Sequence, residues 1–442
     1  MALSGLDIYK LLPKTNCRDC GFPTCLAFAM QLAKKAVSIE KCPFISPQVK
    51  AQLEQASAPP IRQVTLGTDK KLVLGSETVL FRHEEKFRNP CGLGVILDDS
   101  MGPEGIAGSL KKLSAMKLER IGQLLEPDIV CLKQTGESAQ FALAANALAD
   151  AKDLNIILMS RDAKGLEAAI AALPGRKPLL FGLDASNRAE VCGLAKKAGL
   201  PVVVSAKDID GLAQLTAECV KDGCQDLVLD TGAKPGREKL WDLTQIRRLS
   251  LKKSNRQLGY PVIAVAEDSD VYAQAAEAAT YILKYASIVL VRSLEAWEML
   301  GLMTLRQNIY TDPQKPLQIE PKVYSFGKVG KDSPVMVTTN FSLSYYTVAG
   351  EVEASKVPAY IISADTEGQS VLTAWASEKF TAEKLAAVLA KSGIAELVSH
   401  KKVIIPGYVA VMSGDLEEQS GWSVIVGPKE ASGIPQFLKN LK

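Results

Sequence analysis

Short apolar runs recur through the middle of the chain, and each is followed by a polar turn and then by apolar residues at helical spacing. Eight such runs lie between about residues 92 and 310, at 94–97, 129–132, 155–158, 179–182, 202–205, 227–229, 262–265 and 288–291. Near-continuous apolar strands separated by helices indicate parallel strands covered on both faces. Eight of these units are the number that closes a (β/α)8 TIM barrel, although an open doubly wound sheet could also hold eight strands. The pattern favours the barrel.

A second alternating region runs from Tyr324 to Lys442 and predicts a smaller α/β domain. Its expected strands are 335–339, 360–364, 403–405 and 423–426, and its expected helices are 342–354, 369–379, 382–391 and 433–441. This alternation predicts a doubly wound, Rossmann-like sheet, whose ligands bind at the carboxyl ends of the strands. Neither G-x-G-x-x-G nor G-x-x-x-x-G-K-[ST] occurs in its loops, which argues against a nicotinamide dinucleotide and against a P-loop.

The amino-terminal residues follow neither pattern and are marked by cysteines. Cys17, Cys20, Cys25 and Cys42 are spaced C-x2-C-x4-C-x16-C-P. Thr24 can cap a helix that begins at Cys25, and the return from that helix brings Cys42 back. Three thiolates on a tight loop and a distant fourth before a proline are typical of a [4Fe-4S] cluster, whereas a four-cysteine zinc site usually pairs two C-x-x-C knuckles. The motif favours the cluster over zinc or over thiols with only a redox role.

Prolines mark the first border between segments. Residues 56–60 read A-S-A-P-P, and consecutive prolines stop a helix and hold the chain extended. A short β-ribbon is expected next, with strands at 62–66 and 72–74 that continue toward 79–81. We therefore expect a [4Fe-4S] domain at residues 1–58, a linker and ribbon at 59–92, the barrel at 93–323 and the α/β domain at 324–442.

Composition excludes some classes of partner. With 47% apolar residues, 23% charged residues and a net charge of +3, the 442-residue chain has no global field that would steer it to nucleic acid or to an acidic membrane. Neither a leader-like segment nor an apolar run of ~20 residues is evident, so we expect a cytoplasmic protein. The five other cysteines lie in or beside apolar segments and are expected to be reduced core residues: Cys91, Cys131, Cys192, Cys219 and Cys224.

Polar residues follow many of the barrel strands: Asp98, Asp99, Lys133, Ser160, Arg161, Asp184, Asp230, Glu267, Asp268, Arg292 and Ser293. A site at this rim is one interpretation, because barrel chemistry lies at the carboxyl ends of the strands. Helix capping is the other, because Asp and Ser are favoured between a strand and a helix. The two histidines, His83 and His400, fall outside the barrel, so acid–base chemistry there would rest on carboxylates.

The whole arrangement resembles a known family. The cysteine motif, the eight-unit barrel and the terminal domain with its T-T-N and T-E-G-Q-S-V-L-T loops resemble the large (gamma) subunit of the corrinoid iron-sulfur protein of the acetyl-CoA (Wood-Ljungdahl) pathway. The resemblance implies a methyl carrier whose cobamide Co(I) accepts methyl from methyltetrahydrofolate through a methyltransferase and donates it to acetyl-CoA synthase. It implies that the [4Fe-4S] cluster reactivates Co(II). It also implies three partners: the methyltransferase, CO dehydrogenase/acetyl-CoA synthase, and a small barrel subunit that completes a heterodimer.

The resemblance further implies the site residues. Cys17, Cys20, Cys25 and Cys42 match the cluster ligands. Corrinoid contacts are expected from three loops of the terminal domain, at Thr339, Asn340 and Tyr346, at Gly368, Ser370, Val371, Leu372 and Thr373, and at Gly427 and Gly433.

One departure concerns the lower cobalt ligand, which many cobalamin proteins supply from the histidine of D-x-H-x-x-G. His400 lacks this context, because Val398 and Val403 stand where Asp and Gly are needed. The corrinoid is therefore expected base-off, with no axial ligand from the protein. Because one cobalt must meet two enzymes, hinges are expected at the A-P-P segment and between Pro313 and Pro321. Two other functions stay open here: a barrel that is itself a pterin-dependent methyltransferase, and an iron–sulfur electron carrier whose terminal domain binds a flavin or nothing.

Overall fold

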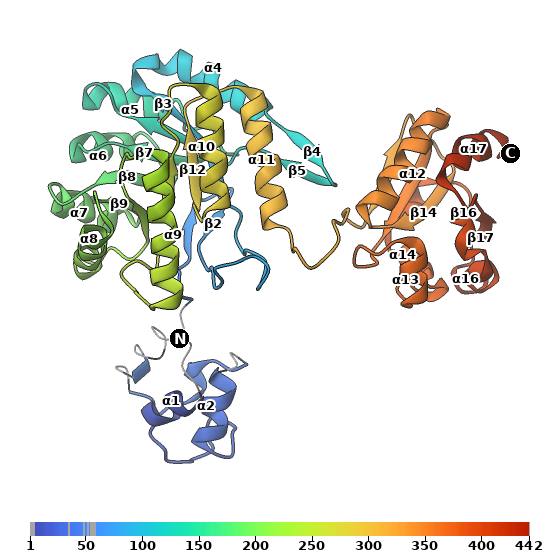
Figure 1. Ribbon diagram of the computed structural model, residues 1–442, viewed down its shortest axis with the longest axis horizontal. Coiled ribbons are helices and arrows are strands. Elements are labelled where there is room, and N and C mark those ends of the chain that lie inside the picture. Colours follow the sequence, from blue (N-terminus) through green and yellow to red (C-terminus); the bar gives the residue numbers. More distant parts are fainter. Residues whose placement is uncertain (1–4, 34–35, 47–48, 51–52, 54–58, 442) are drawn as a thin grey trace. The chain divides into compact units, whose positions relative to one another are not determined.

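The computed structural model describes residues 5–33, 36–46, 49–50, 53 and 59–441, which form two compact units (Figure 1). The first unit is Met1–Lys117 with Glu126–Tyr310, and the second is Leu118–Leu125 with Thr311–Lys442. The finer division at residues 58, 92 and 323 stays a prediction. No helix among the described residues is both long and apolar enough to cross a membrane.

The cysteine-bearing segment contains α1 (Gly5–Leu11), α2 (Cys25–Ala33) and the 3-10 turn η1 (Ile39–Lys41). Helix α2 begins where the sequence predicts, because the Thr24 hydroxyl accepts a hydrogen bond from the Ala27 N–H at 3.1 Å. Phe28 and Ala29 on α2 pack against Ile8 of α1 in a small buried core. Residues 56–58 of the predicted linker lie outside the described residues.

All eight apolar runs of the middle region form parallel strands. They are β3 (Gly92–Asp98), β6 (Ile129–Lys133), β7 (Asn155–Met159), β8 (Leu179–Leu183), β9 (Val202–Ser205), β10 (Leu227–Asp230), β11 (Ile263–Val265) and β12 (Ile288–Val291). Their order is β10-β9-β8-β7-β6-β3-β12-β11, and a parallel bridge between Leu229 and Val262 joins the two ends of the sheet. The barrel prediction is therefore confirmed over the open sheet.

Helices cover the outside of the barrel (Figure 1). After the 3-10 turn η2 (Asp99–Met101) they are α4 (Gly102–Ala115), α5 (Ser138–Asn146), α6 (Ala163–Ala171), α7 (Arg188–Ala198), α8 (Ile209–Lys221), α9 (Gly236–Lys252), α10 (Val271–Leu283) and α11 (Ala296–Tyr310). Strand side chains that point inward, such as Cys131, Val203 and Leu290, fill the interior. The barrel is thus a packed core, and ligands must approach its rims.

An antiparallel ribbon covers one end of that core. Its strands are β1 (Val64–Leu66) and β2 (Leu72–Leu74), and Val64, Leu66 and Leu74 belong to the same buried cluster as the barrel interior. A Cβ on Gly67 would lie 2.1 Å from the side-chain oxygen of Asn155, the first residue of β7, so the ribbon lies against the amino ends of the strands. The predicted extension toward residues 79–81 is wrong, because those residues form no strand.

The second unit is built on a five-stranded sheet of β13 (Val323–Phe326), β14 (Val335–Thr339), β15 (Ala359–Ala364), β16 (Lys402–Ile405) and β17 (Ser423–Val426). The order is β13-β15-β14-β16-β17, and only β13 is antiparallel to its neighbour. Its helical elements are α12 (Ser342–Ser355), α13 (Val371–Ala376), α14 (Ala382–Lys391), α15 (Ile394–Leu397), η3 (Gly407–Met412), α16 (Ser413–Ser420), η4 (Ala431–Gly433) and α17 (Ile434–Asn440).

Strand alternation divides the core of this unit in two. Val335 and Val337 face one cluster with α14 and α16, whereas Met336 faces the other with α12 and α17. The sheet therefore has helices on both faces. The chain leaves β14 for β15 toward one edge of the sheet and leaves β16 for β17 toward the other edge. The point between β14 and β16, where this direction changes, is the switch point at which open α/β sheets bind ligands.

A hairpin from the barrel sequence belongs to the second unit. It consists of β4 (Leu118–Arg120) and β5 (Gln123–Leu125), and the sequence pattern did not predict it. Ile121 at its turn is buried among the residues of α12, and its N–H donates a hydrogen bond to the Tyr346 hydroxyl at 2.9 Å.

Candidate cofactor sites

The loop before α2 has an unusual backbone. Lys14, Asn16, Arg18 and Gly21 all have positive φ, between +49° and +82°. Non-glycine residues rarely adopt this conformation, and clusters of such residues are found at functional sites. Backbone of this kind is one of the ways in which proteins form anion-binding loops. The loop that carries Cys17 and Cys20 therefore has the irregular backbone that is common at functional sites.

The four thiols of the motif lie around this loop. Cys25 is buried, Cys20 and Cys42 are half-buried and Cys17 is exposed. Asn16 links the loop to α2, because its N–H donates to the Cys25 sulfur at 3.4 Å and its side-chain oxygen accepts from the Cys25 N–H at 2.8 Å. Burial raises the pKa of the Cys42 thiol, a hydrogen bond with the Phe44 backbone opposes the rise, and the other three thiols add to it. The Cys42 sulfur is therefore within electrostatic range of the other three thiols.

In the described residues, no three His, Cys, Asp or Glu side chains are close enough to hold a single metal ion. A [4Fe-4S] cluster does not need that closeness, because each of its four thiolates binds a different iron. The exposed Cys17, the N–H donors and the apolar Phe22–Phe28 pair, with ring centroids 5.7 Å apart, all fit such a cluster.

The terminal sheet has a pocket of about 320 Å³ at its switch point. Its floor comes from Thr338 on β14 and Ile405 on β16, and α12 forms one wall. Of the corrinoid contacts expected from the sequence, Ser370, Val371 and Gly427 line this pocket. Among the lining residues that the sequence reasoning missed are Thr338 on β14, Thr347 on α12, and Ile405 and Tyr408 at and after the end of β16. Ser344, Thr347 and Val348 are three to four residues apart and so share one face of α12. This spacing could have predicted that the helix forms a wall of the pocket.

The other expected contacts do not line this pocket. Leu372 is exposed on α13, and the Thr373 hydroxyl bonds the Ser370 hydroxyl at 2.9 Å. Gly433 precedes α17, and a Cβ there would lie 2.9 Å from Pro428. Tyr346 lies on the other side of α12, where its hydroxyl contacts the hairpin at Ile121.

Asn340 organises the loop after β15. Its side-chain nitrogen donates to Gln318 at 3.3 Å and to Asp365 at 3.1 Å. Its side-chain oxygen accepts from the backbone N–H groups of Thr366 and Gly368 and from the Thr366 hydroxyl, each at 3.0 Å. Gly368 has φ +74°, which glycine adopts without strain. The amide of Asn340 is therefore fully used within the protein, and its role is to position the loop.

Thr338 and Thr339 end β14, are almost completely buried, and have hydroxyls without a hydrogen-bond partner in the described part of the chain. Thr338 lines the pocket, whereas Thr339, the next residue along the strand, does not. Leu343 and Tyr408, which line the pocket, and Leu372 and Trp375 on α13 are large apolar side chains that stay exposed. Unpaired hydroxyls inside and apolar side chains outside fit a large ligand with an apolar ring and polar substituents. The pocket volume accommodates only part of such a ligand, so most of the ring would lie against the exposed residues.

His400 is occupied elsewhere. Its Nδ1 accepts from the Lys402 N–H at 3.2 Å, so its Nε2 donates to the Ser333 carbonyl at 3.0 Å. It precedes β16 and thus lies at the amino edge of the sheet, opposite the pocket.

At the barrel rim, many of the polar residues singled out from the sequence have structural partners. Asp99 accepts hydrogen bonds from the backbone N–H groups of Thr135 and Gly136, and Asp184 accepts from the Ser186 N–H. Asp230 forms a buried ion pair with Lys239 at 3.1 Å. Local structure therefore accounts for these three carboxylates.

Comparisons with known proteins cover almost the entire chain. A family model for the CO dehydrogenase/acetyl-CoA synthase delta subunit matches residues 63–438, and one for an Fe-S cluster matches residues 12–44. The corrinoid/iron-sulfur protein large subunit of Moorella thermoacetica is 42% identical over 441 residues, which cover 99% of each chain. The acetyl-CoA decarbonylase/synthase complex subunit gamma of Methanothermobacter thermautotrophicus is 34% identical over 456 residues, covering 100% of this chain and 99% of that one.

Solved structures include a dihydropteroate synthase from Thermus thermophilus that is 17% identical, with a TM-score of 0.39, and covers 56% of this chain and 99% of that chain.

Proposed function

The chain belongs to the family of corrinoid/iron-sulfur protein large subunits and acetyl-CoA decarbonylase/synthase gamma subunits, and we propose that it is a methyl carrier in acetyl-CoA synthesis. The observation that carries this proposal is the match over 99% of the chain to a relative that is named for both cofactors. When bound, the corrinoid supplies a cobalt atom that accepts and donates methyl, and the cluster supplies the electron that restores cobalt after oxidation.

We assign the cluster to the amino-terminal segment. Cys17, Cys20, Cys25 and Cys42 supply one thiolate each, and the N–H groups of the left-handed loop offset the negative charge of the cluster. The Asn16 N–H next to the Cys25 sulfur adds a hydrogen bond of the kind that tunes cluster potential.

We assign the corrinoid to the Rossmann-like terminal domain. The pocket at the switch point, the unpaired Thr338 hydroxyl that lines it and the exposed apolar side chains support this assignment. In this proposal Ser370, Val371, Thr373 and Gly427 contact the corrinoid directly, while Asn340 and Gly368 hold the loop that carries those contacts.

We further propose that the corrinoid is base-off, without a protein ligand on cobalt. The hydrogen bonds of His400 at the amino edge of the sheet support this, since its imidazole is committed away from the pocket. An electron paramagnetic resonance spectrum of the Co(II) state should lack nitrogen splitting from a protein imidazole, and the spectrum of His400→Ala should be identical. A nitrogen-coupled signal that disappears in His400→Ala would contradict the proposal.

The proposed partners are a small barrel subunit, a methyltetrahydrofolate methyltransferase and CO dehydrogenase/acetyl-CoA synthase. The names of the relatives as subunits of a complex support the existence of partner subunits. We propose a cytoplasmic location for the assembly.

The decisive experiment is cofactor analysis of anaerobically purified chain, alone and with its small subunit, followed by methyl transfer from methyltetrahydrofolate. We expect about four irons and one corrinoid per chain, and methyl uptake only when the methyltransferase is added. Methyl uptake by the chain alone would favour the barrel-methyltransferase alternative. Iron without corrinoid, with or without flavin, would favour the electron carrier.

A further inference from the structure

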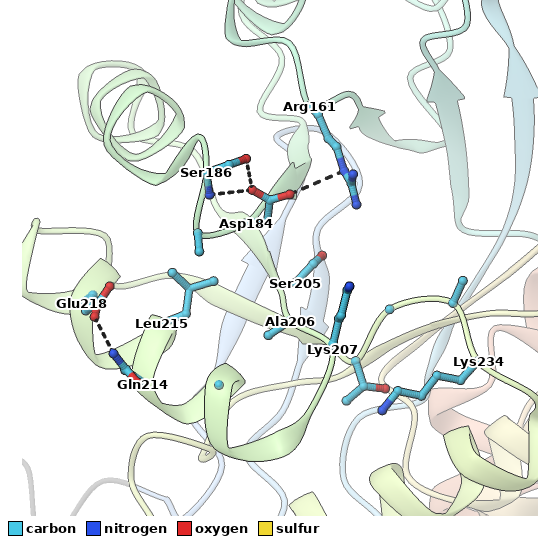
Figure 2. A pocket seen from close by; sticks show the side chains of 15 residues that line it. Arg161, Asp184, Ser186, Ser205, Ala206, Lys207, Gln214, Leu215, Glu218 and Lys234 are labelled. Atoms are coloured by element: carbon cyan, nitrogen blue, oxygen red, sulfur yellow. Dashed lines mark hydrogen bonds and ion pairs between the residues drawn. The ribbon is translucent and has the colours of Figure 1, made fainter.

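The proposed function does not use a pocket at the barrel rim. This pocket, of about 810 Å³, lies at the carboxyl ends of β8, β9 and β10 (Figure 2). One face of α8, with Gly211, Gln214, Leu215 and Glu218, forms a wall. Figure 2 shows Arg161, Lys207 and Lys234 along one side of the opening and Gln214 and Glu218 along the other. Pockets of this volume accommodate a small metabolite, and the carboxyl rim is where barrels bind their ligands.

Most charged side chains around this pocket are paired with a group of opposite charge, but one lysine has no such partner among the described residues. Glu218 pairs with Arg188, whose Nε lies 3.5 Å from its oxygen, and accepts a hydrogen bond from Gln214. Asp184 accepts hydrogen bonds from Ser186, and hydrogen bonding together with Arg161 lowers the pKa of Asp184 despite its partial burial. Lys234 pairs with Asp242. Lys207 has no hydrogen bond or ion pair with any part of the chain that the structure describes. One ammonium group at the opening is therefore available.

A buried hydroxyl gives a second, independent indication of a ligand. Thr231 directly follows β10, lines the pocket and is completely buried, yet its Oγ1 has no hydrogen-bond partner within the described residues. Leaving a buried hydroxyl unpaired destabilises a fold, and such groups commonly mark the place of a water, an ion or a ligand. Ser205 next to it donates to Asp230 at 3.0 Å, so it does not satisfy Thr231.

We propose that this pocket binds a small metabolite through an oxyanion, a carboxylate or a phosphate. Lys207 supplies the charge, Thr231 donates a hydrogen bond to the oxyanion, and Arg161 shifts between Asp184 and the ligand, since its present Nε to Asp184 distance of 3.6 Å is loose. Gln214 and Glu218, on the opposite wall, accept hydrogen bonds from N–H or O–H groups of the rest of the metabolite. None of these residues is among those assigned to either cofactor, so the proposal does not depend on the proposed function.

The test is calorimetric titration of the cofactor-loaded full-length chain at low ionic strength, with inorganic phosphate and with citrate. We expect saturable binding of at least one of them. Lys207→Ala should weaken it tenfold or more, as expected for a hydrogen bond to a charged group. Lys177→Ala, an exposed lysine just before β8 at the amino end of the barrel, is the matched control and should leave the affinity unchanged. The anion whose binding depends on Lys207 identifies the oxyanion class.

Thr231→Val supplies a readout that does not depend on finding the natural ligand. Valine has the same shape without the hydroxyl, so in the absence of an anion the melting temperature of the variant should be at least that of the parent. Adding the anion should raise the melting temperature of the variant much less than that of the parent. A destabilised Thr231→Val would mean that the hydroxyl already has a partner. That result would overturn the proposal. So would a titration in which neither phosphate nor citrate binds, or one in which Lys207→Ala and Lys177→Ala lose the same affinity for the anion.

Discussion

Individual side chains acquire different chemistry here from their surroundings. Cys25 and Cys91 are both buried thiols, but Cys25 lies beside the left-handed loop and accepts a hydrogen bond from Asn16. Cys91 is enclosed in the barrel, where burial raises the pKa of its thiol to about 12 and keeps it protonated at neutral pH. Only a thiolate binds metal, so these environments separate cluster ligands from core residues.

The cysteines give the first prediction. Cys20→Ala should lose the iron of the cluster, because a [4Fe-4S] cluster requires four thiolates, while the circular dichroism of the barrel stays unchanged. Cys91→Ala, at a buried thiol outside the motif, is the control and should keep about four irons. Iron analysis checks both, and full iron content in Cys20→Ala would contradict the assignment.

Thr373 gives the second prediction. Its side chain is exposed on α13, so Thr373→Leu should change the free energy of unfolding by less than about 0.5 kcal/mol. If the corrinoid lies against this residue, the extra volume should weaken retention with a typical overpacking cost of ~1–3 kcal/mol. Corrinoid content after gel filtration is the measurement. Glu383→Leu, an exposed position on α14, should retain the corrinoid; unchanged content in Thr373→Leu would place the ring elsewhere.

Among the structural elements, the loops that follow the paired strands β14 and β15 are joined through one side chain. Asn340 ends the T-T-N sequence after β14 and holds the turn at Thr366 and Gly368 after β15. The adjacent strand ends are thus fixed to each other at the edge where the ligand is proposed to bind.

Asn340→Ala should leave the N–H groups of Thr366 and Gly368 buried and unpaired. At about 1–3 kcal/mol for each of the two unpaired groups, the terminal unit should lose roughly 2–6 kcal/mol of stability and release corrinoid more readily. Hydrogen exchange should become faster in residues 365–370. Asn146→Ala, at an exposed residue on α5, is the control, and equal exchange in the two variants would argue against this role for Asn340.

For the whole molecule, the two units are connected by more than one stretch of chain. The hairpin Leu118–Leu125 leaves and rejoins the barrel sequence but packs within the terminal unit. Within the stretch Pro313–Pro321, where a hinge is expected, Ile319 is buried and its N–H donates to the Asn340 carbonyl at 2.8 Å. The hinge stays a prediction, and this contact favours a position before Ile319.

Ile121 tests this connection. Ile121→Ala should leave a cavity in the terminal core and cost about 2–4 kcal/mol, although the residue lies within the barrel sequence. Hydrogen exchange should speed up in α12 and stay unchanged in β6 and β7. Leu124→Ala, at an exposed leucine of the same hairpin, should have little effect. Faster exchange confined to the barrel would show that the hairpin belongs energetically to the barrel.

The sequence by itself determined the eight barrel strands, the four parallel strands of the terminal sheet and the cap at Thr24, because these depend on local periodicity and local hydrogen bonds. It also determined the cysteine motif, whose spacing is a covalent property of the chain. Helix α13 was predicted too long, at 369–379, because apolar spacing alone does not locate the exact residue at which a helix begins or ends.

Only the tertiary structure decided the rest. The hairpin at Leu118–Leu125 was missed because its turn is Ile121-Gly122, both with positive φ, where Asn-Gly is the usual signal. Isoleucine is unfavourable in that conformation, and its burial in a core formed by residues two hundred positions away offsets the strain. Likewise, no sequence pattern could show that the side chain of Asn340 makes all its hydrogen bonds inside the protein. Nor could one show that the Thr231 hydroxyl has no partner among the described residues. Both depend on groups that are distant in the sequence.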